Sequence, residues 1–375
     1  MKLVTLENSN NAFNGVPFND TIESFFDTYK VDEDIECYQL LFCPYGTGTS
    51  FDDLNKIKFQ SRIVILNIID EIINEDGSFA IKELTKFCLD HPDQNFIIFN
   101  FQLNIKDQLK LDNLYTDTIQ SSNFKGNFKR CEKKDITNRW LLLNSGSKIH
   151  RILTICYLLS KDYYLNGDIT FDMETRLGDW DRKDLSKMSN EFRNKFMKGY
   201  ERFKSNQFTL LNLTKYTDTE TVVNNYNINL LPVYENVGVE IITATSFFEK
   251  TPGLSEKEFQ SVYGKTFPIY IGGVGSAREI KKFFNLDTFD DIIDHSYDTI
   301  EDHYERLSTA LEKNEKLLDG STNIKELWFD NQKRFEENCN KVDSMLHDKE
   351  YQKMHNDNKI KKALTHFNCS FKETI

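Results

Sequence analysis

Short apolar runs that alternate with helix-type segments are the feature that most constrains the fold of this chain. In the first part of the sequence the runs are CYQLLFC (37–43), SRIVILNII (61–69) and FIIFNF (96–101). A strand that is apolar at nearly every position is buried on both faces, as in a parallel sheet covered by helices. Between the last two runs, Ile81, Leu84 and Phe87 follow helical spacing. We therefore predict a Rossmann-like β-α-β domain at 1–135.

The same rhythm restarts after a polar stretch at 107–138, which we interpret as a linker or an irregular segment. The second set of predicted strands is RWLLLN (139–144), VGVEIITATSF (237–247) and FPIYIGG (267–273). The predicted helices of this part are IHRILTICYLLS (149–160), SEKEFQSVYG (255–264) and SAREIKKFF (276–284). These patterns predict a second α/β domain at 139–318, followed by a helical segment at 319–375. Two such halves leave a cleft, and parallel sheets bind ligands at the carboxyl ends of their strands.

Charge and composition limit the classes of function. The net charge of −12 opposes a general nucleic-acid coat protein, because phosphate binding needs clustered Lys and Arg. No apolar run approaches the roughly 20 residues that cross a bilayer, and the first residues lack a signal-peptide core. The 7 cysteines form no C-x-x-C pair, which indicates reduced thiols. We expect a cytoplasmic protein without a membrane span, and the sequence does not indicate its oligomeric state.

The first candidate site follows the strand at 139–144. Asn144 ends this strand, Ser145 and Gly146 form a small loop, and His150 and Arg151 lie in the first turn of the next helix. The N–H groups at a helix start attract phosphate, and arginine adds a permanent, bidentate positive charge. An ordinary β-α turn with a surface arginine explains the same residues. The spacing of a Walker loop is absent.

The second candidate site opens the helix at 255–264. The macrodipole favours Glu256 at a helix N-terminus but disfavours Lys257, so a nearby anion would explain the lysine. The carboxylate can accept hydrogen bonds from ribose hydroxyls, and the ammonium can neutralise a diphosphate. Ser255 with Glu258 also forms a capping box, and both interpretations are compatible.

Two further segments carry acidic residues. We interpret the acidic residues of FDDIIDHSYDTIEDHYERL (289–307) as a solvated face. Its histidines, His295 and His303, lie too far apart in sequence to form a zinc-binding pair four residues apart on a helix. The D-x-D pattern in GDWDRKD (178–184) does not follow a buried strand, so we interpret it as a loop. We predict no metal site.

Taken in order, these elements resemble the donor domain of GT-B glycosyltransferases, and more narrowly the fucosyltransferase-like group common in phages and large viruses. In that group a Ser/Thr-Glu-Lys triplet opens a helix, as Ser255, Glu256 and Lys257 do here. A Pro-containing strand that ends in glycine follows, as in FPIYIGG, and then TFDDIIDHSYDTI (288–300) and YERL (304–307). The resemblance covers about 139–318. The chain departs from the group at Ser145 and Lys148, where arginines are common, and at Glu258, where threonine is common.

The resemblance implies a GT-B fold of two Rossmann-like domains and an inverting, metal-independent glycosyl transfer from a nucleoside-diphosphate sugar. In this interpretation Arg151 and Lys257 hold the diphosphate, Glu256 holds the ribose, and Gly272, Gly273 and Gly275 allow close approach of the donor. No cofactor is implied beyond the donor substrate, whose base and sugar stay open. If the chain is viral, it acts in the cytoplasm of the host cell.

The first domain is expected to bind the acceptor and supply the catalytic base. We predict Asp70 or Glu71 as this base, because they follow the strand at 61–69; a helix N-cap is an equally good interpretation of Asp70. The Gly-rich loop YGTGTS (45–50), with Thr47 and Thr49, is the candidate acceptor loop.

Two other functions stay open. A phage-type DNA glycosyltransferase would modify hydroxymethylated bases, and the Lys-rich stretch 123–134 is its candidate DNA strip. A degenerate GT-B fold would serve as a binding or scaffold module. A glycan acceptor is the leading prediction.

Overall fold

The structure is a computed structural model that describes most of the chain. The described residues are 2–4, 20–40, 51–68, 80–100, 105, 109, 111–118, 129–137, 139–144, 148–171, 190–205, 208–211, 230–244, 247–248, 253 and 256–374. They fall into two compact units. Unit 1 comprises Met1–Lys125, Glu249–Leu254 and Ser344–Ile375, and unit 2 comprises Gly126–Phe248 and Ser255–Asp343. The bounds expected from the sequence stay predictions, and residues 344–375 group with unit 1.

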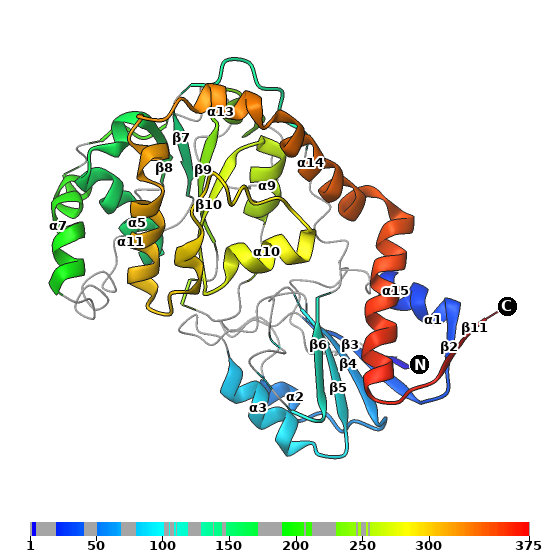
Figure 1. Cartoon of the computed structure of the whole chain (residues 1–375). Coiled ribbons are helices and arrows are strands. Elements are labelled where there is room, and N and C mark those ends of the chain that lie inside the picture. The colour runs from blue at the N-terminus through cyan, green and yellow to red at the C-terminus, as the bar shows by residue number, and fades with distance from the viewer. Residues whose placement is uncertain are drawn as a thin grey trace. The chain divides into compact units, whose positions relative to one another are not determined.

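Unit 1 contains a five-stranded sheet in the order β1-β3-β4-β5-β6, in which every pair is parallel (Figure 1). Its strands are β1 (Lys2–Val4), β3 (Ile35–Leu40), β4 (Ile63–Ile68), β5 (Asn95–Phe99) and β6 (Leu114–Asp117). In β4, Ile63 and Ile65 pack into one core while Val64 and Leu66 pack into another. The parallel sheet with two buried faces, predicted from the apolar runs, is therefore confirmed for this unit.

The interpretation of 107–138 as a linker or irregular segment is wrong at β6. This strand pairs with β5, with Leu114 opposite Phe96. Leu114 and Thr116 are buried, whereas Tyr115 and Asp117 are partly exposed. Of the two buried residues in this strand only Leu114 is aliphatic, so the four residues resemble a loop in sequence. They form a strand because they pair with the buried strand β5.

Helices cover the sheet of unit 1. They are α1 (Asp20–Thr28), α2 (Phe51–Leu54), α3 (Ile81–Asp90) and α15 (Lys349–His366). Ile360, Ala363 and Leu364 of α15 join the core that contains Ile22 and Phe25 of α1. The expectation of a wholly helical C-terminal segment is wrong at its end. There β11 (Phe371–Glu373) pairs antiparallel with β2 (Tyr29–Val31).

Unit 2 contains a four-stranded parallel sheet in the order β10-β9-β7-β8. The strands are β7 (Trp140–Leu143), β8 (Gly167–Thr170), β9 (Val239–Thr243) and β10 (Phe267–Ile271). The helices of this unit are α5 (Ile149–Ser160), α7 (Asn190–Lys204), α8 (Leu231–Tyr234), α9 (Glu256–Gly264), α10 (Ser276–Phe284), α11 (His303–Lys313), α12 (Glu315–Leu318) and α13 (Ile324–Asp330), with the 3₁₀ turns η2 (Tyr163–Asn166) and η5 (Ser296–Thr299). Helix α14 (Gln332–His347) begins in unit 2, and its residues after Asp343 belong to unit 1. Figure 1 shows α5 beside α11, which it contacts.

The strand order of unit 2 reverses between β7 and β9. The chain leaves β7 toward β8 on one side and leaves β9 toward β10 on the other. Ligands of open parallel sheets bind outside the carboxyl ends of the two strands at such a reversal. In unit 1 the described strands of the main sheet follow chain order without a reversal. The topology therefore selects the carboxyl ends of β7 and β9 as the place to look for a site.

Candidate functional site

Asn144 joins the carboxyl ends of β7 and β9. Its Oδ1 accepts a hydrogen bond of 2.5 Å from Thr243 Oγ1, and its backbone N–H donates to Thr170 Oγ1 at 2.9 Å. Asn144 is 2% exposed, and its Nδ2 has no hydrogen-bond partner within the described part of the chain. A buried amide group without a partner is costly, so this N–H₂ is available for an acceptor atom of a ligand.

His150 fixes α5 against β9. Its Nε2 lies 2.8 Å from the carbonyl oxygen of Ala244, which can only accept, so Nε2 carries the hydrogen. Burial lowers the pKa of His150 well below its ordinary value, and the neighbouring cations lower it further. The imidazole is therefore neutral, and its hydrogen bond to Ala244 positions α5. Its predicted contact with the donor stays a prediction.

The charges of three cationic side chains act on His150, and we call these side chains the basic cluster. They are Lys148 and Arg151 at the start of α5 and Lys257 in the first turn of α9. Each of them lowers the pKa of His150, after the larger effect of burial, so all three act on one imidazole. Arg151 is 5% exposed and Lys257 is 9% exposed. Arg151 and Lys257, which are far apart in sequence, thus both act on the imidazole of His150, whose Nε2 contacts the residue that follows β9.

The glycines after β10 serve packing in this structure. A Cβ on Gly272 would lie 2.6 Å from Ser276 Oγ and 3.0 Å from Ala244 Cβ, so only glycine fits between β9 and α10. The carbonyl of Gly273 accepts a hydrogen bond of 2.8 Å from Ser276 Oγ. Gly275 has a φ of +81°, which glycine adopts without strain. Their predicted approach to a donor stays a prediction.

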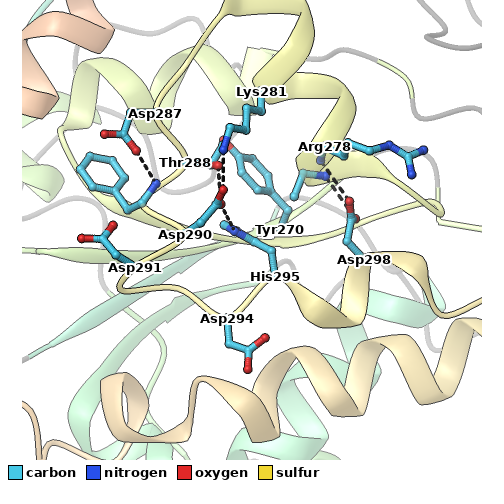
Figure 2. Close-up of polar contacts among 12 residues, drawn as sticks. Tyr270, Arg278, Lys281, Asp287, Thr288, Asp290, Asp291, Asp294, His295 and Asp298 are labelled. Atoms are coloured by element: carbon cyan, nitrogen blue, oxygen red, sulfur yellow. Dashed lines mark hydrogen bonds and ion pairs between the residues drawn. The ribbon is translucent and has the colours of Figure 1, made fainter.

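Asp298 occupies the N-terminus of α10. Its carboxylate accepts from the N–H groups of Ala277 at 3.2 Å and Arg278 at 3.0 Å (Figure 2). Burial raises the pKa of Asp298, while these two backbone hydrogen bonds lower it. Because a carboxylate of the protein already accepts from these N–H groups, the first turn of α10 is not open to an anionic ligand.

The interpretation of the acidic residues of 289–307 as a solvated face is wrong at Asp298, which is buried. Asp290, Asp291 and Asp302 are exposed, as predicted, and Asp302 also caps α11 by accepting from the backbone N–H groups of Tyr304 and Glu305. Asp290 accepts from Thr288 Oγ1 at 2.7 Å, from His295 at 3.0 Å and from Lys281 (Figure 2). Burial raises the pKa of Asp290, but hydrogen bonds from Lys281, Thr288 and His295 outweigh it and give about 2. This network holds the segment to α10.

Arg306 is a structural residue whose role the sequence did not indicate. It is 2% exposed and lies inside the YERL stretch. Its guanidinium donates to the carbonyls of Gly272 at 3.0 Å, Phe247 at 2.9 Å and Ile300 at 2.7 Å. A single buried arginine thus ties together the segments that follow β9, β10 and η5. An arginine in an otherwise ordinary helix start carries no sequence signal for these contacts.

The described part of the Lys-rich stretch makes internal contacts. Arg130 pairs with Asp343 and Glu336, and Lys134 pairs with Glu235. Lys133 donates to the carbonyls of Tyr234 at 2.6 Å and Val237. These cations serve the fold of unit 2, which leaves less positive charge in this stretch for DNA.

Several predicted site residues lie outside the described residues. These are Thr47, Thr49, Asp70, Glu71, Ser145, Gly146 and Ser255, together with the side chain of Glu256 and the segment 178–184. Their roles stay predictions. In the described ranges, no group of three or more His, Cys, Asp or Glu is placed to hold a metal ion. No described helix has the length and apolar composition that crossing a bilayer requires.

Comparison with known proteins adds only weak structural likeness. The sequence matches no protein-family model and no curated protein. Among solved structures, it is similar to a chain in the crystal structure of accessory secretory proteins 1, 2 and 3 in Streptococcus pneumoniae, with a TM-score of 0.32 and 9% identity. The match covers 85% of this chain and 56% of that chain. A TM-score of this size supports no statement about function.

Proposed function

We propose that this chain is an inverting, metal-independent glycosyltransferase of the GT-B type, and that unit 2 binds its nucleoside-diphosphate sugar. Two observations support the proposal: the three cations of the basic cluster act on one imidazole at the start of α5, and the Asn144 amide at the reversal between β7 and β9 has an N–H₂ group without a partner in the described residues. Cations and an N–H donor at the carboxyl ends of parallel strands suit a bound diphosphate. The Ser255-Glu256-Lys257 triplet, which resembles that of the fucosyltransferase-like group, supports the same assignment.

In the proposed reaction the basic cluster stabilises the departing diphosphate. Negative charge grows on the bridging oxygen as the bond to the sugar breaks, and Arg151 and Lys257 would neutralise it without a metal ion. Asn144 Nδ2 would donate to a phosphate oxygen, and Glu256 would hold the ribose. A carboxylate of unit 1, Asp70 or Glu71, would take the proton of the acceptor hydroxyl, and a single displacement would invert the anomeric carbon.

The test of the donor site is diphosphate binding by matched lysine variants. We expect Lys257→Met to weaken binding of UDP and GDP about tenfold to a hundredfold, because a hydrogen bond to a charged group is lost. Lys265→Met is the matched control, since Lys265 is 8% exposed, lies in unit 2 and pairs with Glu336 at 2.5 Å. Calorimetric titration in the presence of EDTA gives the affinities, and circular dichroism checks the fold of each variant.

Asn144→Asp provides an independent variant of the same size. It places a carboxylate where the amide now lies, so the bound diphosphate would be repelled. If both Lys257→Met and Asn144→Asp keep the affinity of the unaltered protein, or if binding requires a divalent cation, the proposal fails. If Lys265→Met loses as much affinity as Lys257→Met, the loss reflects general destabilisation of unit 2, and the assignment of Lys257 to the diphosphate site fails.

The acceptor is proposed to be a glycan or another hydroxyl compound. Transfer assays with glycans and with duplex DNA containing hydroxymethylated bases would separate this from the DNA-modifying alternative. Absence of binding to any nucleotide would instead favour a scaffold module.

A further inference from the structure

Four aromatic side chains gather beside the carboxyl ends of β9 and β10, and we call them the aromatic shelf. They are Phe247 and Phe248, which follow β9, and His303 and Tyr304 at the start of α11. The ring of Phe248 lies 5.1 Å from those of Phe247 and His303, and 6.4 Å from that of Tyr304. Phe248 is 40% exposed, whereas Phe247 is 2% exposed. The shelf thus has a buried base and an open aromatic surface.

The aromatic shelf is continuous with the basic cluster. The ring of Phe247 stacks on that of His150, with a centroid distance of 4.7 Å and an interplanar angle of 14°. His150 is the imidazole on which Lys148, Arg151 and Lys257 all act. The stacked rings of His150 and Phe247 therefore connect the basic cluster, which acts on His150, to the exposed ring of Phe248, which contacts Phe247. All of these residues belong to unit 2.

Arg306 holds the shelf in place. It donates to the carbonyl of Phe247 at 2.9 Å, and its guanidinium carbon lies 5.7 Å from the centroid of the Phe247 ring. It also belongs to the same helix as His303 and Tyr304, and bonds to the carbonyl of Ile300 at 2.7 Å. Both parts of the shelf are therefore attached to one buried side chain, so the surface is preorganised for a flat ligand.

We propose that the aromatic shelf binds the nucleobase of the donor, with the exposed ring of Phe248 as its main stacking surface. This inference rests on the proposed donor site. A nucleoside diphosphate carries a flat ring and an anionic group separated by a ribose, which matches the shelf and the basic cluster. An aromatic face stacks on every base, so the shelf contributes affinity while discriminating little between purine and pyrimidine.

The experiment compares inorganic pyrophosphate, UDP and GDP as ligands by calorimetric titration. We expect the unaltered protein to bind UDP and GDP at least about tenfold more tightly than pyrophosphate, because stacking adds affinity. Phe248→Ala is expected to lose about tenfold to a hundredfold in nucleotide affinity while its pyrophosphate affinity is unchanged. Phe248→Tyr keeps the ring and is expected to retain nucleotide affinity. Phe329→Ala is the matched control, since Phe329 is also exposed in unit 2, at 53%.

The outcomes separate this inference from the donor site itself. If pyrophosphate binds but nucleotides bind no more tightly, the shelf does not hold the base while the diphosphate site stands. Unchanged nucleotide affinity in Phe248→Ala overturns the inference in the same way. Equal loss of pyrophosphate and nucleotide affinity in Phe248→Ala assigns the residue a purely structural role and also overturns it. If none of the three ligands binds the unaltered protein, the proposed function and the inference fail together.

Discussion

Glu240 shows how a single buried residue departs from its ordinary chemistry. It lies in β9, is 3% exposed, and accepts from Tyr234 Oη at 2.8 Å and from Thr266 Oγ1 at 3.1 Å. Burial raises the pKa of Glu240 to about 7, although Tyr234, Thr266, Lys133 and Ser261 act to lower it. Burial likewise lowers the pKa of nearby Lys133 to about 8. In both residues burial disfavours the charged form, and the neighbouring groups only partly offset this effect.

The raised pKa makes the stability of unit 2 depend on pH. The folded protein binds the Glu240 proton more tightly than the unfolded chain does, whose pKa is near the ordinary 4.5. The stabilisation from this proton is fully present below pH 4.5 and is lost as the pH rises through about 7. Each pH unit in that window changes the unfolding free energy by up to about 1.4 kcal/mol.

We therefore expect Glu240→Gln to gain stability relative to the unaltered protein between pH 5 and pH 8, by on the order of 2–3 kcal/mol. Glutamine keeps the size of the side chain and does not titrate. Urea unfolding followed by tryptophan fluorescence reports on unit 2, because its residues include Trp140 and Trp328. An unfolding free-energy difference between the two proteins that is the same at both pH values would contradict the assignment.

At the scale of elements, the contact between α5 and α7 depends on a glycine. A Cβ on Gly199 of α7 would lie 1.7 Å from the backbone oxygen of Cys156 in α5. The two helices therefore touch backbone to backbone at this point. Tyr157 and Phe196 pack nearby, with ring centroids 6.1 Å apart. Because α5 also carries Arg151 and His150, the position of α7 bears on the geometry of the candidate site.

Gly199→Ala reverses the effect that alanine usually has in a helix. Alanine favours an exposed helix by about 1 kcal/mol relative to glycine, but here the new methyl group must push the helices apart. We expect a net loss of about 1–3 kcal/mol in unfolding free energy, as for an overpacked core. Asn194→Ala, at an exposed position of α7, is the control and should change stability by less than about 0.5 kcal/mol. A stabilised Gly199→Ala protein would show that the helices are not in close contact.

At the scale of the whole molecule, the two ends of the chain build one core. Ile360, Ala363 and Leu364 of α15 pack with Ile22 and Phe25 of α1, and β11 pairs with β2. Unit 1 therefore requires residues from both termini, so its core is complete only when α15 has been added. The entropy lost on closing a loop grows only slowly with the length of the loop, so the long separation of α1 and α15 in sequence adds little to the free-energy cost of this core.

We expect Leu364→Ala to destabilise unit 1 by about 2–5 kcal/mol and to leave the nucleotide binding proposed for unit 2 intact. Leu364 is fully buried, whereas Met354 on the same helix is 57% exposed. Met354→Ala is therefore the control. Hydrogen exchange measured along the chain would locate the change. Increased exchange confined to unit 2 would contradict the assignment of α15 to the first core.

The sequence by itself determined the local elements and the parallel character of both sheets. Runs such as IVILNI in β4 and WLLL in β7 are buried on both faces, and the bounds of α5 and α10 match the predicted segments. The pattern of apolar residues encodes which side of an element is buried, and that information is local. Arg151 and Lys257 became candidates because they lie at the starts of predicted helices, where free N–H groups attract anions.

Only the tertiary structure decided which elements are neighbours. The place of β9 between β7 and β10 creates the reversal at which Asn144 lies, and no spacing in the sequence specifies that order. The edge strands β6 and β8, the capping of α10 by Asp298 and the contacts of Arg306 depend on partners distant in sequence. Periodicity records whether a residue is buried but not the residue that it meets, so these features follow from the folded chain alone.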